Sequence, residues 1–282
     1  MSQRASDDQN IVWVDGELAP AAMARVSPFD HGLLTGDGVF ETLIVYDGRP
    51  FAVRRHLERL AVSCAGMGLE APDPAVVRDA LRQVVMANGL QQARLRVTVT
   101  GGDSPLGSER GAGGPSLIVA GGALATWPAT ADVAVVPWTR NEKGALAGLK
   151  TTSYGENVVA LAHAKERGAS EAIFANSVGH LCEGTGSNVF VGIGGRLVTP
   201  PLTSGCLAGV TRALVIELTG ATEVDLPLDA LASADEAFLT STTREVQAIR
   251  AVDGAALPVA PGPLTQAAAA AFKDLVKRDL DP

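Results

Sequence analysis

The sequence predicts a mixed α/β protein, of the α+β type, that is divided into two lobes. Segments with the alternation of β-strands are interspersed with segments that have the spacing of amphipathic helices. The chain has 282 residues, enough for about two domains, and its composition changes within the segment ALATWPATA. We therefore expect an N-terminal α+β lobe at 1–122, a linker at 123–131 and a C-terminal lobe at 132–282.

The N-terminal lobe is predicted to contain a mostly antiparallel sheet and two helices. The dipeptide Asp47-Gly48 between two alternating segments indicates a hairpin, and Asn88-Gly89 is typical of a helix end. The expected strands lie at 11–16, 39–53 (as a hairpin), 93–102 and 116–122, and the expected helices at 55–69 and 74–88. A glycine-rich loop, 101–115, is expected between the last two strands.

The C-terminal lobe is predicted to follow the same mixed pattern. An apolar strand opens it, several short strands with turns fill its middle, and a helix closes it. The expected strands lie at 132–138, within 171–200 and at 235–249, and the expected helices at 155–168, 211–220 and 267–280.

Composition excludes several classes of function. The formal net charge is −8, which argues against nucleic acid as a partner because phosphate binding needs a basic surface. No apolar run approaches the length of a membrane helix, and the polar N-terminus does not resemble a secretory signal. The three cysteines are few and distant, so we expect no disulfide framework and a reducing, cytoplasmic location. The four histidines lack metal-ligand spacing, and no metal site is expected.

Four features could carry chemistry, although each also has an ordinary structural explanation. Lys150 follows an apolar stretch, where a lysine can also lie on the surface with its stem packed. Glu183 precedes a small-residue loop, where a carboxylate is costly unless donors bind it. Residues 209–211 begin a helix whose free amides accept a threonine cap or an anion, and residues 241–243 carry three hydroxyls that also suit a turn. Together they match the needs of pyridoxal 5′-phosphate (PLP): a lysine for its aldehyde, an acid for its pyridine nitrogen and donors for its phosphate.

Longer motifs carry a specific resemblance. The chain contains, in order, GDGVFET, HLERL, LKTTSY, EAIFANSVGHLCEGTGSNVFV, LAGVTR and FLTSTTREV. From about Val12 to Gly254 it resembles the class IV aminotransferase family, the PLP enzymes of fold type IV. This family includes branched-chain and D-amino acid aminotransferases, R-selective amine transaminases and 4-amino-4-deoxychorismate lyases. The resemblance implies a two-lobe fold like that of D-amino acid aminotransferase, with the cofactor between the lobes, and a homodimer.

The resemblance also implies roles for individual residues. Lys150 would form the Schiff base with the cofactor and move the substrate proton, and Glu183 would contact the pyridine nitrogen. Tyr154 would reach the 3′-oxygen of the cofactor. The implied phosphate contacts are Arg59, the backbone amides of Val210 and Thr211, and Thr242.

The residues expected near the substrate favour one reaction and leave others open. Phe40 and Thr42 share one face of a strand, and Thr42 fits the FxT pattern of the family's lyases. Arg96 and Arg110 are suited to carboxylates, and the lyase substrate carries two. The 101–115 loop lacks the RxH pair typical of the D-amino acid enzymes and the YxR and RGD patterns typical of the branched-chain enzymes.

We therefore predict a 4-amino-4-deoxychorismate lyase that acts on a small anionic amine and releases pyruvate and 4-aminobenzoate for folate synthesis. The alternative is a class IV aminotransferase for branched-chain or D-amino acids or R-amines. A third hypothesis is a non-enzymatic binding protein with the same fold.

Overall fold

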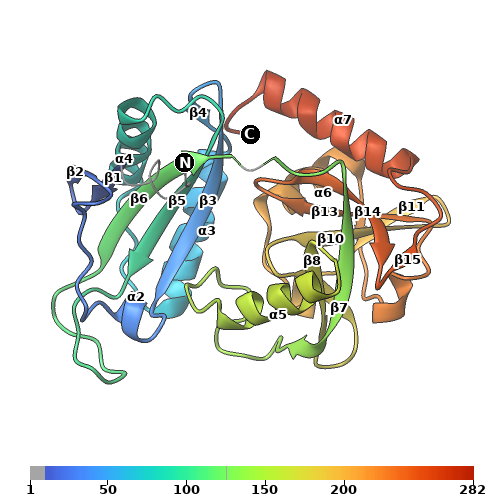
Figure 1. Cartoon of the computed structure of the whole chain (residues 1–282), viewed down its shortest axis with the longest axis horizontal. Coiled ribbons are helices and arrows are strands. Elements are labelled where there is room, and N and C mark those ends of the chain that lie inside the picture. Colours follow the sequence, from blue (N-terminus) through green and yellow to red (C-terminus); the bar gives the residue numbers. More distant parts are fainter. Residues whose placement is uncertain (1–9, 125) are drawn as a thin grey trace. The chain divides into compact units, whose positions relative to one another are not determined.

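The computed structural model describes residues 10–124 and 126–282, which divide into two units (Figure 1). Unit 1 comprises Met1–Ala125, Leu149–Tyr154 and Asp279–Pro282, and unit 2 comprises Thr126–Gly148 and Gly155–Arg278. This division differs from the expected one, which placed Lys150 and Tyr154 in the C-terminal lobe. Backbone hydrogen bonds are the reason, because the segment that contains Lys150 pairs with a strand of unit 1.

Unit 1 contains an antiparallel sheet with the strand order β2-β1-β6-β5-β3-β4. Every neighbouring pair in this sheet is antiparallel, as the alternating pattern predicts. The strands are β1 (Ile11–Val14), β2 (Glu17–Pro20), β3 (Gly38–Tyr46), β4 (Arg49–Pro50), β5 (Ala93–Thr100) and β6 (Ser116–Ala123). The helices are α2 (His31–Leu34), α3 (Val53–Met67) and α4 (Pro74–Ala87).

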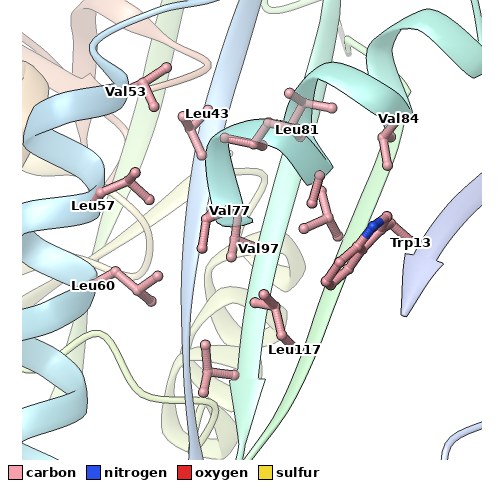
Figure 2. Close-up of a cluster of buried hydrophobic side chains, with 14 of the residues drawn as sticks. Trp13, Leu43, Val53, Leu57, Leu60, Val77, Leu81, Val84, Val97 and Leu117 are labelled. Carbon is pink, nitrogen blue, oxygen red and sulfur yellow. The ribbon is translucent and has the colours of Figure 1, made fainter. Parts of the chain in front are cut away.

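The core of unit 1 lies between one face of this sheet and the helices α3 and α4. Figure 2 shows Leu57 of α3 and Leu81 of α4 in the same cluster as Leu43 and Val97 of the sheet. Burying each such side chain contributes about 1.5–3 kcal/mol to folding. Alternation along β3 places the carboxylate of Glu41 on this same apolar face, so this charge needs partners from the helices.

Unit 2 contains a mixed sheet with the order β12-β11-β10-β13-β14-β7-β8-β9, and β15 pairs with β14. Its strands are β7 (Thr130–Arg140), β8 (Glu171–Asn176), β9 (Leu181–Gly184), β10 (Asn188–Ile193), β11 (Arg196–Thr199), β12 (Thr222–Glu223), β13 (Glu236–Ser241), β14 (Glu245–Val252) and β15 (Ala255–Ala256). Its helices are α5 (Gly155–Glu166), α6 (Val210–Thr219) and α7 (Pro263–Arg278), with short 3₁₀ turns at Leu202–Ser204 and Leu228–Ala230.

Two boundaries differ from the sequence prediction for physical reasons. The last helix, expected at 267–280, begins at Pro263, because the buried Glu236 carboxylate accepts hydrogen bonds from the amides of Leu264 (3.0 Å) and Thr265 (2.8 Å). That cap comes from another strand and is invisible in the local sequence. Strands β6 and β7 occupy the two ends of the expected linker at 123–131, whose residue 125 lies outside the described residues. Over the described ranges, none of the helices has the length and apolar character needed to cross a membrane.

Candidate active site

The backbone of Lys150 is fixed beside the first residues of β3. The amide of Phe40 donates to the Lys150 carbonyl at 2.9 Å, and the Lys150 amide donates to Ser63 Oγ of α3 at 3.1 Å. The Lys150 Nζ lies 4.3 Å from the centre of the Phe40 ring and 5.9 Å from that of Tyr154. The side chain is therefore held against two aromatic rings, which differs from the alternative of a solvated surface lysine.

The Phe40 ring also gathers two further predicted site residues. Arg96 places its guanidinium carbon 3.7 Å from the ring centre, and Tyr154 meets the ring edge-on at 5.1 Å. Thr42 lies directly opposite Arg96 in the register of β3 and β5. Burial lowers the pKa of the Arg96 guanidinium, but arginine keeps its charge in proteins. Unit 1 thus brings together a lysine, an arginine, a phenol and a threonine hydroxyl.

Arg59 is held by a buried carboxylate that the sequence reasoning did not identify. Glu41 is fully buried and accepts two hydrogen bonds from Arg59, from Nε and from Nη2, each at 2.7 Å. It also accepts one from His56 Nδ1 at 2.7 Å. Burial raises the pKa of the Glu41 carboxyl, but Arg59 and His56 outweigh it, and the pKa falls to about 2.

The two helix residues of this cluster carry different charges. Burial lowers the pKa of His56 more than Glu41 raises it, so His56 is neutral at pH 7 and donates from Nδ1. Burial also lowers the pKa of Arg59, but Glu41 and the Tyr154 phenol raise it above its usual value. Glu41 therefore fixes the guanidinium plane of a residue expected to bind phosphate.

Arg110 has partners that account for it without a substrate. Its Nε and Nη2 donate to the two oxygens of Asp37 at 2.7 and 2.6 Å. Its Nη1 and Nη2 also donate to the carbonyls of Gly68 (2.8 Å) and Met67 (2.6 Å) at the end of α3. The hydrogen bonds from Arg110 lower the pKa of Asp37. Arg110 thus attaches the glycine-rich loop to α3, and these contacts give no support to the prediction that it binds substrate.

Glu183 lies on β9 of unit 2, and donors contact both of its carboxylate oxygens. The amide of Leu207 donates to Oε2 at 2.8 Å. Arg140 Nε lies 3.1 Å from Oε1, and its N–H is not aligned for a hydrogen bond within the described residues, so this contact is a charge–charge interaction. Leu207 precedes α6 by three residues, which ties Glu183 to the start of that helix.

The N-terminus of α6 forms an anion site in the same unit. No side chain caps this end of the helix in the described structure, so the amides of its first turn, including Val210 and Thr211, are not satisfied within the helix. A Cβ on the preceding Gly209 would collide with Asn188 Oδ1, so the backbone passes where no larger residue fits. The buried Thr240 Oγ1, opposite Asn188 on β13, has no hydrogen-bond partner among the described residues. This combination of unused donors fits a phosphate group.

The predicted site residues fall into two sets. Unit 1 holds Lys150, Tyr154, Arg59, Phe40, Thr42 and Arg96, and unit 2 holds Glu183, Val210, Thr211 and the half-buried turn residue Thr242. Sequence reasoning missed Glu41, His56, Arg140, Asn157 and Thr240. One signal was present, since Glu41 interrupts an otherwise apolar strand and must be paired. Nothing local marks Arg140 or Asn157, because their partners are distant in the sequence.

The fold and these two sets of residues define a PLP-dependent enzyme. The residues fit the cofactor, because they offer a lysine, a carboxylate with two protein donors and a helix terminus with spare donors. Among the described residues, no group of three or more His, Cys, Asp or Glu side chains could hold a metal ion. The chain belongs to the class IV aminotransferase family, since the family model for amino-transferase class IV matches residues 38–252.

Relatives and solved structures agree with this assignment. The chain is 31% identical to a putative branched-chain-amino-acid aminotransferase of Methanocaldococcus jannaschii, over 94% of this chain and 96% of the relative. It is 30% identical to a bifunctional aminodeoxychorismate lyase / D-amino acid transaminase of Mycobacterium tuberculosis, over 89% and 94%. A branched-chain amino acid aminotransferase of T.th., solved with pyridoxamine 5′-phosphate, is similar with a TM-score of 0.89 and 25% identity, over 95% and 94%.

Proposed function

We propose that this protein is a PLP-dependent transaminase that acts on small amino acids, with branched-chain amino acids as the first substrates to test. The surroundings of Lys150 carry this proposal. Two aromatic rings and one guanidinium, that of Arg96, lie close to its side chain. An apolar wall with a single cation suits a substrate with one carboxylate and an apolar side chain.

The proposed roles follow from the contacts of each residue. PLP, when bound, supplies a ring that withdraws electrons from the substrate Cα. Lys150 Nζ condenses with the cofactor aldehyde and, once released by the substrate amine, takes the Cα proton. Arg96 binds the substrate carboxylate, with Thr42 and Phe40 beside it. Glu183 holds a proton at the pyridine nitrogen.

Phosphate binding is proposed for donors of both units. Arg59, whose guanidinium plane Glu41 fixes, offers a charged contact in unit 1. The amides of Val210 and Thr211, with the hydroxyl of Thr242, offer neutral donors in unit 2. The Tyr154 phenol, which raises the pKa of Arg59, is proposed to bind the 3′-oxygen of the cofactor.

Aminodeoxychorismate lyase is the second candidate. A relative with both lyase and D-amino acid transaminase activity in its name supports it. The sequence argument for a lyase used two arginines for two carboxylates. Because Arg110 is bound to Asp37 and two carbonyls, one of those two cations is already neutralised. This observation favours the transaminase.

Paired assays with the purified holoenzyme test the proposal. L-leucine and L-valine with 2-oxoglutarate, D-alanine with 2-oxoglutarate, and an R-amine with pyruvate are offered in parallel with 4-amino-4-deoxychorismate. We expect keto-acid-dependent amine exchange with the branched-chain substrates. Formation of 4-aminobenzoate and pyruvate without any such exchange would establish the lyase instead.

Substitution of Arg96 tests the substrate pocket. Loss of a charged hydrogen bond to a carboxylate costs about 1.5–3 kcal/mol, so Arg96→Gln should raise KM for the amino acid about tenfold or more. Arg94, two residues earlier on the same exposed face of β5, provides the matched control, and Arg94→Gln should leave KM within about twofold. Equal KM values for the two variants would remove Arg96 from the pocket.

We also propose that the enzyme is a cytoplasmic homodimer. Helix α5 exposes Val158 (65%) and Val159 (54%), an apolar pair that a second copy of the chain would cover. All three cysteines are free and buried, which suits a reducing compartment. Light scattering after gel filtration tests the dimer, and a monomer at micromolar concentration would contradict it. Cell fractionation tests the location.

A further inference from the structure

We propose that Arg140 is a positioning residue that acts through Glu183, keeping its carboxylate ionised and in place so that the shared proton stays on the pyridine nitrogen of the cofactor. This inference rests on the proposed function, in which Glu183 is the partner of that nitrogen. Arg140 ends β7, and its side chain is only 17% exposed. Its Nε lies 3.1 Å from Glu183 Oε1.

Three further contacts orient the Arg140 guanidinium. Its Nη2 donates to Asn157 Oδ1 on α5 at 2.9 Å, and its carbon lies 4.2 Å from the centre of the Phe174 ring on β8. Its Nη1 lies 3.6 Å from Glu156, whose side chain is 78% exposed and contributes little because water screens it. Asn157 itself is buried and donates to the carbonyl of Thr185 at 2.8 Å. The guanidinium is thus held from α5 and β8 beside the carboxylate that it faces.

The groups of unit 2 that surround Glu183 differ in charge. Cys182 and Cys206 are the neighbouring thiols, and burial raises the pKa of each, that of Cys206 to about 11, so both are uncharged at neutral pH. The Leu207 amide binds the second carboxylate oxygen and carries no net charge. Arg140, by contrast, places a full positive charge beside the first carboxylate oxygen of Glu183.

The chemical consequence concerns one proton. When a carboxylate and a pyridine nitrogen share a proton, the proton rests on the more basic of the two atoms. A guanidinium at 3.1 Å favours the ionised carboxylate and lowers its basicity, so the proton stays on the nitrogen. Once the charge of Arg140 is removed, the largely buried carboxylate would hold the proton more strongly. The ring would then carry less positive charge and stabilise the substrate carbanion less well.

The decisive experiment reports on the nitrogen itself. Wild type, Arg140→Gln, Arg140→Lys and Glu183→Gln are each loaded with PLP labelled with ¹⁵N in the ring, and the ¹⁵N chemical shift distinguishes the protonated from the unprotonated nitrogen. In Arg140→Gln we expect bound cofactor, a shift towards the unprotonated value and a kcat that is about tenfold to a hundredfold lower with KM within about threefold. Arg140→Lys keeps the charge and should restore most of the protonated signal.

A matched control separates this effect from the loss of any ion pair in the unit. Arg250 on β14 is paired with Asp132 at an exposed site, and Arg250→Gln should change neither the ¹⁵N signal nor kcat. If Arg140→Gln does not fold, Asn157→Asp replaces it, because a second carboxylate would share the charge of Arg140 and should move the signal in the same direction.

The outcomes distinguish the inference from the proposed function. A protonated nitrogen and a kcat within about twofold of wild type in Arg140→Gln, or in Asn157→Asp when that variant replaces it, would overturn the role of Arg140. If Glu183→Gln changes the signal and that Arg140 or Asn157 variant does not, only this inference fails. If Glu183→Gln leaves the signal unchanged, Glu183 is not the partner of the nitrogen, and both the site assignment and the inference fail.

Discussion

Replacing Glu41 with glutamine should cost this protein several kcal/mol of stability, although the two side chains have nearly the same shape. Glu41 is fully buried and accepts three hydrogen bonds at 2.7 Å, two from Arg59 and one from His56. Glutamine cannot neutralise Arg59 and can accept through only one oxygen. Removing one partner of a buried ion pair costs about 3–5 kcal/mol.

The pH dependence gives an independent value for the same interaction. The pKa of Glu41 falls from 4.5 to about 2 on folding, which corresponds to about 3 kcal/mol. Because the folded pKa is the lower one, this stabilisation is complete above about pH 4.5 and is lost as the pH falls towards about 2.

Urea unfolding of wild type and Glu41→Gln between pH 7 and pH 3, followed by circular dichroism, tests the prediction. The difference in unfolding free energy should be about 3–5 kcal/mol at pH 7 and should shrink below pH 4.5. Glu58→Gln is the control, because Glu58 forms an exposed pair with Arg54 and should cost at most about 1 kcal/mol. A loss below about 1 kcal/mol in Glu41→Gln, with no change in pH dependence, would refute the reasoning.

Three other substitutions test the site. Lys150→Ala should abolish turnover and the visible absorbance of the lysine-bound cofactor, and a variant that retained full activity would contradict the assignment of Lys150. Gly209→Ala should weaken PLP affinity at least about tenfold, because the new methyl group collides with Asn188; titration of the apoenzyme measures this, and Gly155→Ala, which meets no neighbour, is the control. Glu171→Gln should lower the unfolding free energy by about 3 kcal/mol, since the buried Glu171 carboxylate binds the Thr185 amide and Ser187 hydroxyl and lies near Arg244; a loss under about 1 kcal/mol in urea unfolding would speak against it.

The family and its cofactor were predicted correctly from the sequence, and the reaction was not resolved. The motifs around Lys150 and Glu183 are contiguous, so a resemblance in the sequence can identify them. The lyase prediction depended on Arg96 and Arg110 acting together. Arg110 is bound by Asp37, a residue 73 positions away, and the relatives favour the transaminase alternative.

Local periodicity was sufficient for the main helices and strands. The apolar spacing of α3 and α4 and the alternation of β3 and β5 reflect one buried face each, and burial of that face is a property of the element itself. The residue types needed for PLP chemistry also stand in short motifs, which is why the cofactor could be predicted.

The partners of those residues depend on the folded chain. Glu41 meets Arg59 because α3 packs on β3, and Arg140 meets Glu183 because β7, β8 and β9 are neighbours in one sheet. Lys150 belongs to unit 1 because its backbone pairs with β3 after the chain has already entered unit 2. These contacts join residues that are tens of positions apart, and strand pairing and helix packing bring them together. Sequence patterns therefore identified the chemical groups, and long-range packing set the charge and orientation of each one.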